Sequence, residues 1–129
     1  MSAAEVAAVI DRLKAAPLNA YDSLPKTPTY PYVIVYADGG VASSDRAADR
    51  RITRSIGWQT TTVGVSAAQC RAALDRVTAA LEDWRPAVDG RVCTKVDHEG
   101  SQPVRPDDEM PDRVLFIATD QWRVVSEPA

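Results

Sequence analysis

Apolar positions near the start of the chain recur with the spacing of an α-helix. Four of them share one helical face at intervals of three, one and three residues: Val6, Val9, Ile10 and Leu13. Ser2 and Glu5 have the spacing of an N-terminal capping box, and Pro17 blocks continuation of the helix. The pattern therefore predicts a helix over residues 3–15.

A second helix is predicted over residues 66–85. Its apolar stripe repeats at intervals of four and three residues: Cys70, Leu74, Val77, Leu81 and Trp84. Ser66 with Gln69 forms another capping box, and Pro86 supplies the stop. The stripe covers only about two heptads and lies between strands, so we expect it to pack on the chain's own sheet rather than in a coiled coil. On this interpretation Leu74→Ala destabilises the fold by about 2 to 5 kcal/mol.

The rest of the chain shows strand patterns and loops. Strands are predicted at residues 20–23, 32–37, 56–65, 91–96 and 112–125. One side of the last strand is expected to be apolar through Val114, Phe116, Ala118, Trp122 and Val124. Residues 97–112, rich in proline and acidic residues, are predicted to be a loop with a short strand at Val104 and Arg105. The order of elements predicts one α+β domain over residues 1–129: a mixed, mainly antiparallel β-sheet with two α-helices packed against it.

The segment at about residues 38–55 has no clear period and is predicted to be a long loop. It holds four arginines: Arg46, Arg50, Arg51 and Arg54. Compact domains rarely hold so long a loop without a use for it. One interpretation is a flexible charged surface loop; the other is a segment ordered by a protein partner, whose carboxylates pair with the arginine forks. Direct nucleic-acid binding ranks third, because no aromatic residues interleave with these arginines. We take the four arginines as a candidate partner interface.

Composition narrows the classes of protein further. The 129 residues are 45% hydrophobic and 26% charged, values typical of a soluble globular domain. The net charge of −3 gives no general attraction to nucleic-acid phosphates. The longest apolar run, residues 33–37, is far short of the roughly 20 residues that span a bilayer, and the N-terminus lacks the layout of a secretory signal. We therefore expect a cytoplasmic protein that contacts no membrane.

No catalytic, cofactor-binding or metal site is predicted. The single histidine, His98, lies in an acidic turn-like segment and is expected to be solvated. Cys70 and Cys93 lack zinc-site spacing and are expected to be buried thiols. A divalent-ion site formed by the acidic residues of 97–109 is the minority alternative, on which the chain would be a small metal-dependent hydrolase. No glycine-rich phosphate-binding motif occurs.

Several short stretches, taken in their order along the chain, carry a resemblance to a known family. They are Tyr30–Tyr36, Ser43–Arg46, Gln59–Gly64 leading into Ala68–Arg71, Val88–Arg91, Asp107–Glu109 and Phe116–Arg123. In this order, and over nearly the whole chain, the sequence resembles the tail terminator proteins (tail completion or minor tail proteins) of long-tailed bacteriophages.

The resemblance implies a structural virion protein and no enzyme. Such a protein forms a homo-oligomeric ring, expected to be hexameric, on the end of the tail tube. The ring stops addition of tail tube protein and offers a surface to the head–tail connector or head completion protein, while DNA passes through without specific binding. Its place would be the neck-proximal end of the virion tail, after assembly in the host cytoplasm. The alternative within the same structural class is a head-completion or neck adaptor protein.

Overall fold

Two long antiparallel strands form the centre of the sheet. The computed structural model describes residues 1–37, 41–43 (backbone only), 53–108 and 114–129. The elements are α1 (Ala3–Ala15), β1 (Asn19–Tyr21), β2 (Tyr32–Ala37), β3 (Val41–Ser43), β4 (Thr53–Gly64), α2 (Ala67–Leu81), β5 (Arg91–Cys93), β6 (Asp97–Ser101), β7 (Arg105–Pro106) and β8 (Phe116–Pro128). The central pair is β4 and β8, in register from Arg54 opposite Ser126 to Gly64 opposite Phe116.

Short strands line both outer edges of this central pair. On the far side of β4, β2 and β3 pair with successive stretches, and β1 adds to β2 as the one parallel strand among those described. On the far side of β8, β5, β6 and β7 pair with successive stretches. The sheet is therefore mixed and mainly antiparallel, as the sequence predicts.

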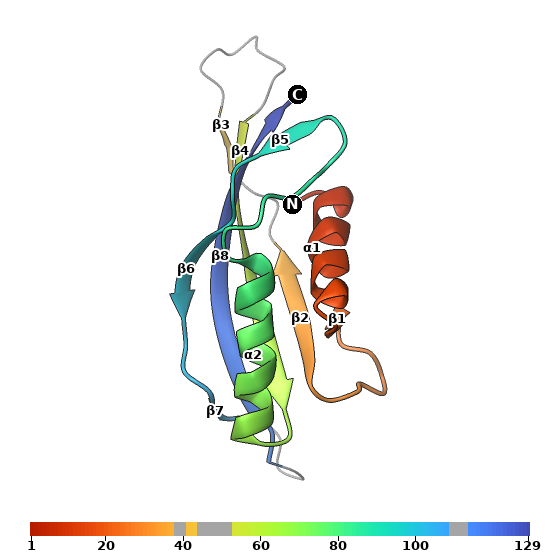
Figure 1. The fold of residues 1–129 in the computed structure, drawn as a ribbon, viewed down its shortest axis with the longest axis vertical. Coiled ribbons are helices and arrows are strands. Elements are labelled where there is room, and N and C mark those ends of the chain that lie inside the picture. Colours follow the sequence, from red (N-terminus) through yellow and green to blue (C-terminus); the bar gives the residue numbers. More distant parts are fainter. Residues whose placement is uncertain (38–40, 44–52, 109–113) are drawn as a thin grey trace.

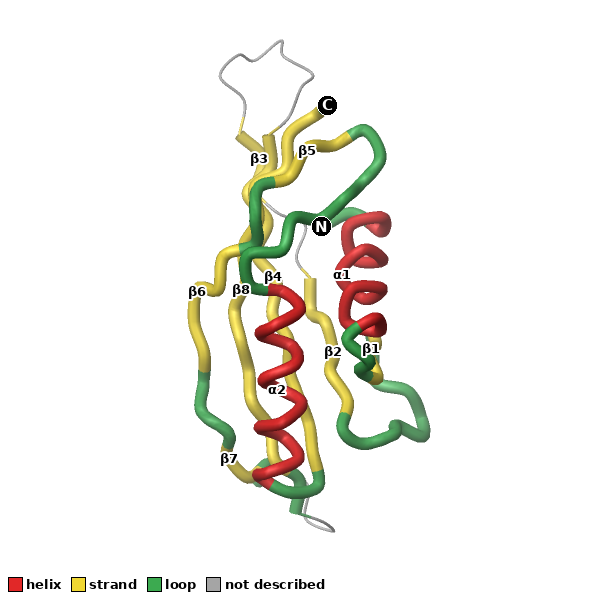
Figure 2. Tube along the Cα trace, viewed as in Figure 1, coloured by secondary structure: helices red, strands yellow, loops and turns green. Residues whose placement is uncertain are grey.

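Both helices lie on the same face of the sheet, α2 over β4 and β8 and α1 beside β1 and β2 (Figures 1 and 2). The main core lies between this helical layer and the sheet, and includes Leu13, Val33, Ile56, Leu81 and Trp122. A smaller apolar cluster of Tyr32, Ile34, Val63 and Leu115 lies on the opposite face.

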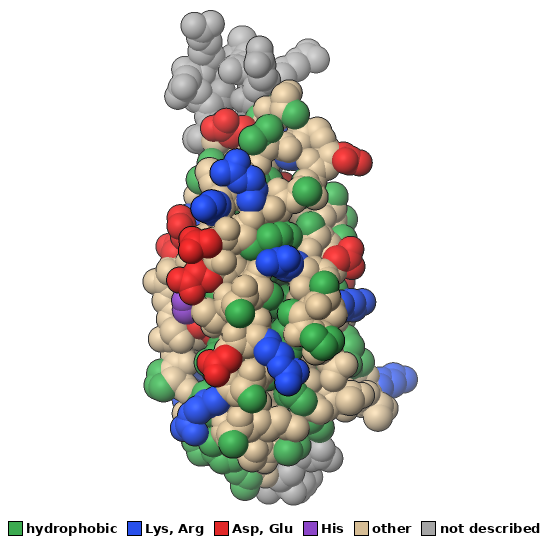
Figure 3. Space-filling view, in the orientation of Figure 1, with side chains coloured by type: hydrophobic (Ala, Val, Ile, Leu, Met, Phe, Trp, Pro, Cys, Tyr) green, Lys and Arg blue, Asp and Glu red, His purple; other side chains and the backbone are tan. Residues whose placement is uncertain are grey.

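Charged side chains of both signs are interspersed over the helical side of the molecule (Figure 3). None of the described helices is long and apolar enough to cross a bilayer. The α+β class is confirmed.

Helix α1 begins and ends where the sequence predicts. The Ser2 hydroxyl accepts the Glu5 backbone N–H at 3.3 Å, and the Glu5 carboxylate accepts the Ser2 backbone N–H at 2.8 Å. This reciprocal pair satisfies two of the backbone donors that every helix N-terminus leaves without an intrahelical partner. Val9 and Leu13 are buried in the core.

Helix α2 begins as predicted but ends earlier. The Ser66 hydroxyl accepts the Gln69 N–H at 3.1 Å, whereas the Gln69 side chain accepts the N–H of Val65 rather than that of Ser66. The helix ends at Leu81, not at residue 85, so Pro86 is not its stop. Asp83 takes a left-handed backbone conformation with φ 60°. The chain then turns so that the carbonyl of Trp84 accepts the Val96 N–H at 2.7 Å.

The buried face of α2 is rotated from the predicted stripe. Its buried residues are Cys70, Ala73, Val77, Ala80 and Leu81, while Leu74 is only half-buried. The cause is a close approach of helix and strand, because a Cβ on Gly64 would lie 2.8 Å from the backbone nitrogen of Cys70. Near this close contact Ala73 faces the core, and the larger Leu74 lies at the margin of the buried face.

Two predicted loops contain strands. Within residues 38–55, β3 pairs with the first residues of β4, so a hairpin arm is present where a loop was expected. Within residues 97–112, β6 and β7 pair with β8, and the predicted short strand lies at 105–106. Neither β6 nor β7 contains a buried residue. These strands form because their backbones pair with β4 or β8. Backbone pairing alone produces no apolar pattern in the sequence.

Candidate functional site

Arg54 is the member of the predicted partner interface that the structure describes. Arg46, Arg50 and Arg51 lie outside the described residues. Arg54 lies in β4 rather than in a loop, between Ala42 of β3 and Ser126 of β8. Its half-buried side chain lines a hollow of about 490 Å³ near the N-terminus of α1, with Met1, Ser2, Ala4, Glu5, Val88, Asp89 and Arg91.

One carboxylate of this hollow, that of Glu5, is already hydrogen-bonded within the fold. Glu5 is only 7% exposed, and one of its oxygens accepts the capping bond from Ser2. Its other oxygen accepts the Ser126 hydroxyl at 3.5 Å. Arg91 donates through Nε to the Ser126 hydroxyl at 2.9 Å and through Nη2 to the Ser126 carbonyl at 2.7 Å. Within the described part of the chain no ion pair to Arg54 is found.

His98 does not lie in a solvated turn, and that prediction is wrong. It belongs to β6, and its Nε2 lies 2.7 Å from Oδ1 of Asp120, a residue of β8 that is 1% exposed. Its ring stacks on Trp122, with centroids 4.3 Å apart and planes inclined by 17°. The indole Nε1 of Trp122 donates to the Thr60 hydroxyl at 2.9 Å. These contacts link β6 to β8 and β8 to β4 on the helical face of the sheet. A carboxyl group buried in the core needs a hydrogen-bonding partner, and His98 provides one for Asp120.

The second oxygen of Asp120 has no hydrogen-bond partner, and neither has the hydroxyl of buried Thr62. Cys70 lies close by, with its Sγ 3.5 Å from the carbonyl oxygen of Thr62. Burial raises the pKa of the Cys70 thiol; Asp120 raises it further, and Arg71 acts in the opposite direction. The thiol therefore stays protonated and behaves as a small core residue.

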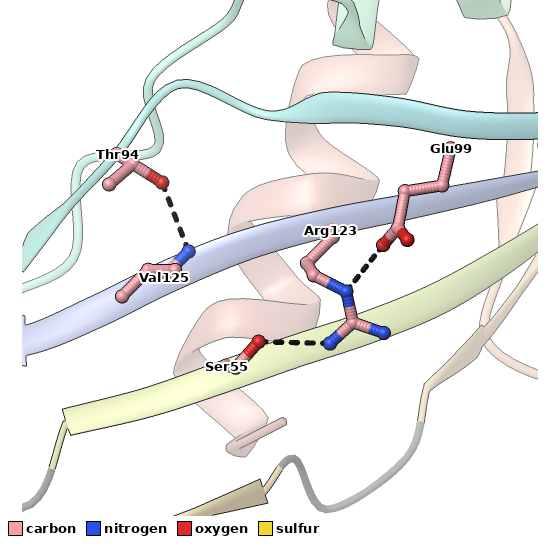
Figure 4. A network of polar contacts seen from close by, with 5 residues as sticks. All are labelled: Ser55, Thr94, Glu99, Arg123 and Val125. Carbon is pink, nitrogen blue, oxygen red and sulfur yellow. Dashed lines mark hydrogen bonds and ion pairs between the residues drawn. The ribbon is translucent and has the colours of Figure 1, made fainter. Parts of the chain in front are cut away.

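The face of the sheet opposite the helices carries a second polar network (Figure 4). Arg123 of β8 bonds through Nε to the carboxylate of Glu99 on β6 and donates through Nη1 to the Ser55 hydroxyl of β4 at 2.9 Å. Farther along β8, the Thr94 hydroxyl accepts the Val125 N–H at 3.0 Å. These bonds tie β6 and the segment before it to the central strands.

Beside Arg123 this open face is hollowed. The hollow, of about 540 Å³, is lined by side chains that include Tyr36, Gln59 and Gln121 around Gly57. Gln121 donates to Gln59 at 2.8 Å, and the Tyr36 side chain is half-exposed. These side chains are typical of a surface that binds another protein rather than of a site for nucleophilic catalysis. Aromatic and arginine side chains are enriched at protein interfaces.

The acidic residues weighed as a divalent-ion site do not converge in the part of the chain that the structure describes. No group of three or more histidine, cysteine, aspartate or glutamate side chains there is placed to hold a metal ion. Glu99 pairs with Arg123, and His98 with Asp120. Glu109 lies outside the described residues.

The fold is shared with solved structures. A chain from the virion of a native gene transfer agent particle matches over 98% of this chain and 99% of its own length, with a TM-score of 0.67 at 18% identity. A second solved chain matches over 95% of this chain and 91% of its own length, with a TM-score of 0.54 at 17% identity. The likeness is one of fold. No family model and no curated protein matches the sequence.

The buried pair of His98 and Asp120 is the feature that reading the sequence missed. One signal was present: the apolar alternation of the last strand, through Ala118, Trp122 and Val124, places Asp120 on the inward side. An acidic residue at such a position predicts a buried carboxylate, and the single histidine of the chain is an obvious partner for it.

Proposed function

We propose that the chain is a structural component of a phage-like particle and acts as its tail terminator. In this role several copies form a ring, expected to be hexameric, that caps the tail tube at its neck-proximal end. The ring stops polymerisation of the tube and offers an attachment surface to the head–tail connector. DNA crosses the ring without specific binding, in keeping with the net charge of −3.

One observation carries the proposal: the end-to-end match with a chain of a gene transfer agent virion, which spans 98% of this chain and 99% of the other. The order of motifs along the sequence supports the finer assignment to the tail terminator family. A ring needs a head-to-tail contact between two different surfaces of the same chain. The Arg54 hollow and the open sheet face are two such surfaces, and they lie on opposite faces of the sheet.

A structural role also fits the use of the chemically reactive side chains. The only histidine has one ring nitrogen committed to buried Asp120, and Cys70 has a raised pKa and no exposure. Both residues therefore stabilise the fold. We propose that the protein has no enzymatic activity.

The decisive experiment combines the purified chain with the tail tube protein of the same particle. Mass measurement and negative-stain electron microscopy should show rings on one end of each tube, and tubes of arrested length. A chain that neither forms rings nor caps tubes would contradict the proposal. A monomer in isolation would not, because the tube end can be the template on which the ring forms.

The same materials test the head-completion or neck adaptor alternative. Labelled protein imaged in particles would then lie on the head vertex rather than on the tube end. The metal-dependent hydrolase alternative is tested by calorimetry with Mg²⁺, Mn²⁺ and Ca²⁺, since such an enzyme must bind at least one of these ions.

A further inference from the structure

Strand β6 is held on β8 in a different way from β5. Its five residues include no buried one, and the pattern alternates between exposed and half-buried. By contrast β5 contributes buried Cys93, and the connector between the two strands contributes buried Val96. Hydrophobic burial therefore contributes little to the docking of β6.

The register of β6 is also interrupted. Asp97 and His98 pair with Arg123 and Trp122, after which the register shifts, and Gly100 and Ser101 pair with Gln121 and Asp120. A bulge of this kind leaves one residue without its place in the ladder and weakens the local pairing. Backbone pairing alone is consequently a modest restraint on this strand.

Two side-chain contacts hold β6 on β8 where apolar burial does not. On the open face Glu99 pairs with Arg123, but both side chains are about two-fifths exposed, at 41% and 42%, so water screens the pair. On the helical face His98 bonds to a carboxylate that is 1% exposed and stacks on Trp122. A hydrogen bond to a buried carboxyl group is worth more than a solvated ion pair, because its loss leaves a buried polar group without that partner.

We propose that His98 and Asp120 form a latch that holds β6 on β8, and that β6 opens as a local unit when the latch is released. Opening leaves the outer edge of β8 without a partner from Asp120 to Arg123, and such an edge can pair with a strand from another chain. The central β4–β8 pairing is untouched by this motion, because β6 lies on the outer edge of β8. The inference concerns the isolated chain and does not depend on the tail terminator assignment.

Hydrogen–deuterium exchange of the full chain tests the latch directly. The variant His98→Phe keeps an aromatic ring over Trp122 and removes the hydrogen bond to Asp120. We expect the amides of residues 97–101 to exchange about ten- to a hundredfold faster in this variant, while those of residues 56–63 in β4 change much less. Glu99→Gln is the matched control on the same strand, and it should change exchange of β6 by less than about threefold.

Two results would overturn the proposal. In the first, His98→Phe accelerates exchange in β6 and β4 by the same factor, so that β6 opens only when the whole chain unfolds. In the second, Glu99→Gln releases β6 as much as His98→Phe does, so that the buried pair has no special part in holding the strand. Asp120→Asn, which keeps an acceptor for the histidine N–H and removes the charge, should fall between wild type and His98→Phe. Exchange in this variant equal to or faster than in His98→Phe would count against the hydrogen bond as the latch.

Discussion

Gly64 at the end of β4 lies directly against Cys70 in the first turn of α2. A Cβ on Gly64 would lie 2.8 Å from the Cys70 nitrogen and 3.0 Å from its Cα. Both atoms belong to the backbone and cannot rotate away, so the absence of a side chain at position 64 sets how closely helix and sheet approach. Cys70 itself is fully buried at this contact.

Gly64→Ala should therefore destabilise the fold by about 1 to 3 kcal/mol, the usual cost of forcing extra volume into a packed site. Urea unfolding followed by circular dichroism gives the free-energy difference. Gly100→Ala is the control, because a Cβ there would meet only the Gln121 side chain, at 4.0 Å. Equal losses for the two variants would mean that the contact with Cys70 does not limit the packing.

Alanine substitutions at Leu81 and Leu74 should lower the free energy of unfolding by clearly different amounts in the same assay. Leu81 is fully buried in the main core, and Leu81→Ala should cost about 2 to 5 kcal/mol. Leu74 is half-buried, so Leu74→Ala should cost about 1 to 2 kcal/mol, less than the apolar stripe of the sequence suggests. If Leu74→Ala proves the more damaging, the orientation of α2 described above is wrong.

The two helices show how far local sequence determines this fold. The bounds of α1 follow from signals inside the segment itself, namely the Ser2–Glu5 cap and the apolar period. The end of α2 does not, because Asp83 turns left-handed to bring Trp84 into a backbone bond with Val96, which comes later in the chain. A proline at position 86 is an adequate stop signal, but this tertiary contact ends the helix before it.

Strand β6 and the pair of His98 and Asp120 could not be predicted from local sequence either, because they too depend on contacts between distant parts of the chain. The segment Asp97–Ser101 has no apolar alternation, and its pairing is supplied by the exposed edge of β8. His98 and Asp120 are 22 residues apart, and only the register of two strands brings them together. Of the candidate interface, Arg54 was predicted to lie in a loop, whereas the structure places it at the base of a hairpin arm; its role toward a partner stays a prediction.

Alkaline pH should weaken the fold through Tyr32. Burial raises the pKa of its phenol, and the neighbouring Tyr30, Tyr36 and Asp107 raise it further, above the ordinary value of 10.0. The unfolded chain then loses this proton before the folded chain does. The contribution of Tyr32 to stability is therefore fully present below pH about 10 and is lost as the pH rises toward its folded-state pKa.

Urea unfolding at a series of pH values between 8 and 11, on the order of half a unit apart, measures this loss. Tyr32→Phe cannot ionise and should flatten the fall in stability. Tyr36→Phe, at a tyrosine that is 50% exposed, should retain most of the wild-type fall, because burial is the main cause of the raised Tyr32 pKa and Tyr36 adds a smaller part. The thiol of Cys70, whose pKa is also raised, contributes a fall of the same sign that both variants keep. If Tyr32→Phe follows wild type at every pH, ionisation of Tyr32 is not coupled to folding.

The arginine segment should matter for assembly and not for folding. Replacing both Arg50 and Arg51 with alanine is expected to change the free energy of unfolding by less than about 0.5 kcal/mol, because the sequence predicts that they lie outside the core. The same double variant should cap tail tubes less completely, because it removes two guanidinium groups that would pair with a partner's carboxylates. Arg54→Ala should act in the same direction on capping, since its guanidinium lines a hollow in which Glu5 is already bonded to Ser2.

A matched double variant on α2, with Arg71 and Arg76 replaced by alanine, removes the same charge from an exposed helical surface. It should fold and cap like wild type. Counting capped tube ends by electron microscopy at increasing salt then compares the three proteins, and the difference between wild type and the Arg50 and Arg51 variant should shrink as ion pairing is screened. An unfolding shift for that variant as large as the one for Leu81→Ala would show that the arginines pack within the fold, and the interface assignment would fail.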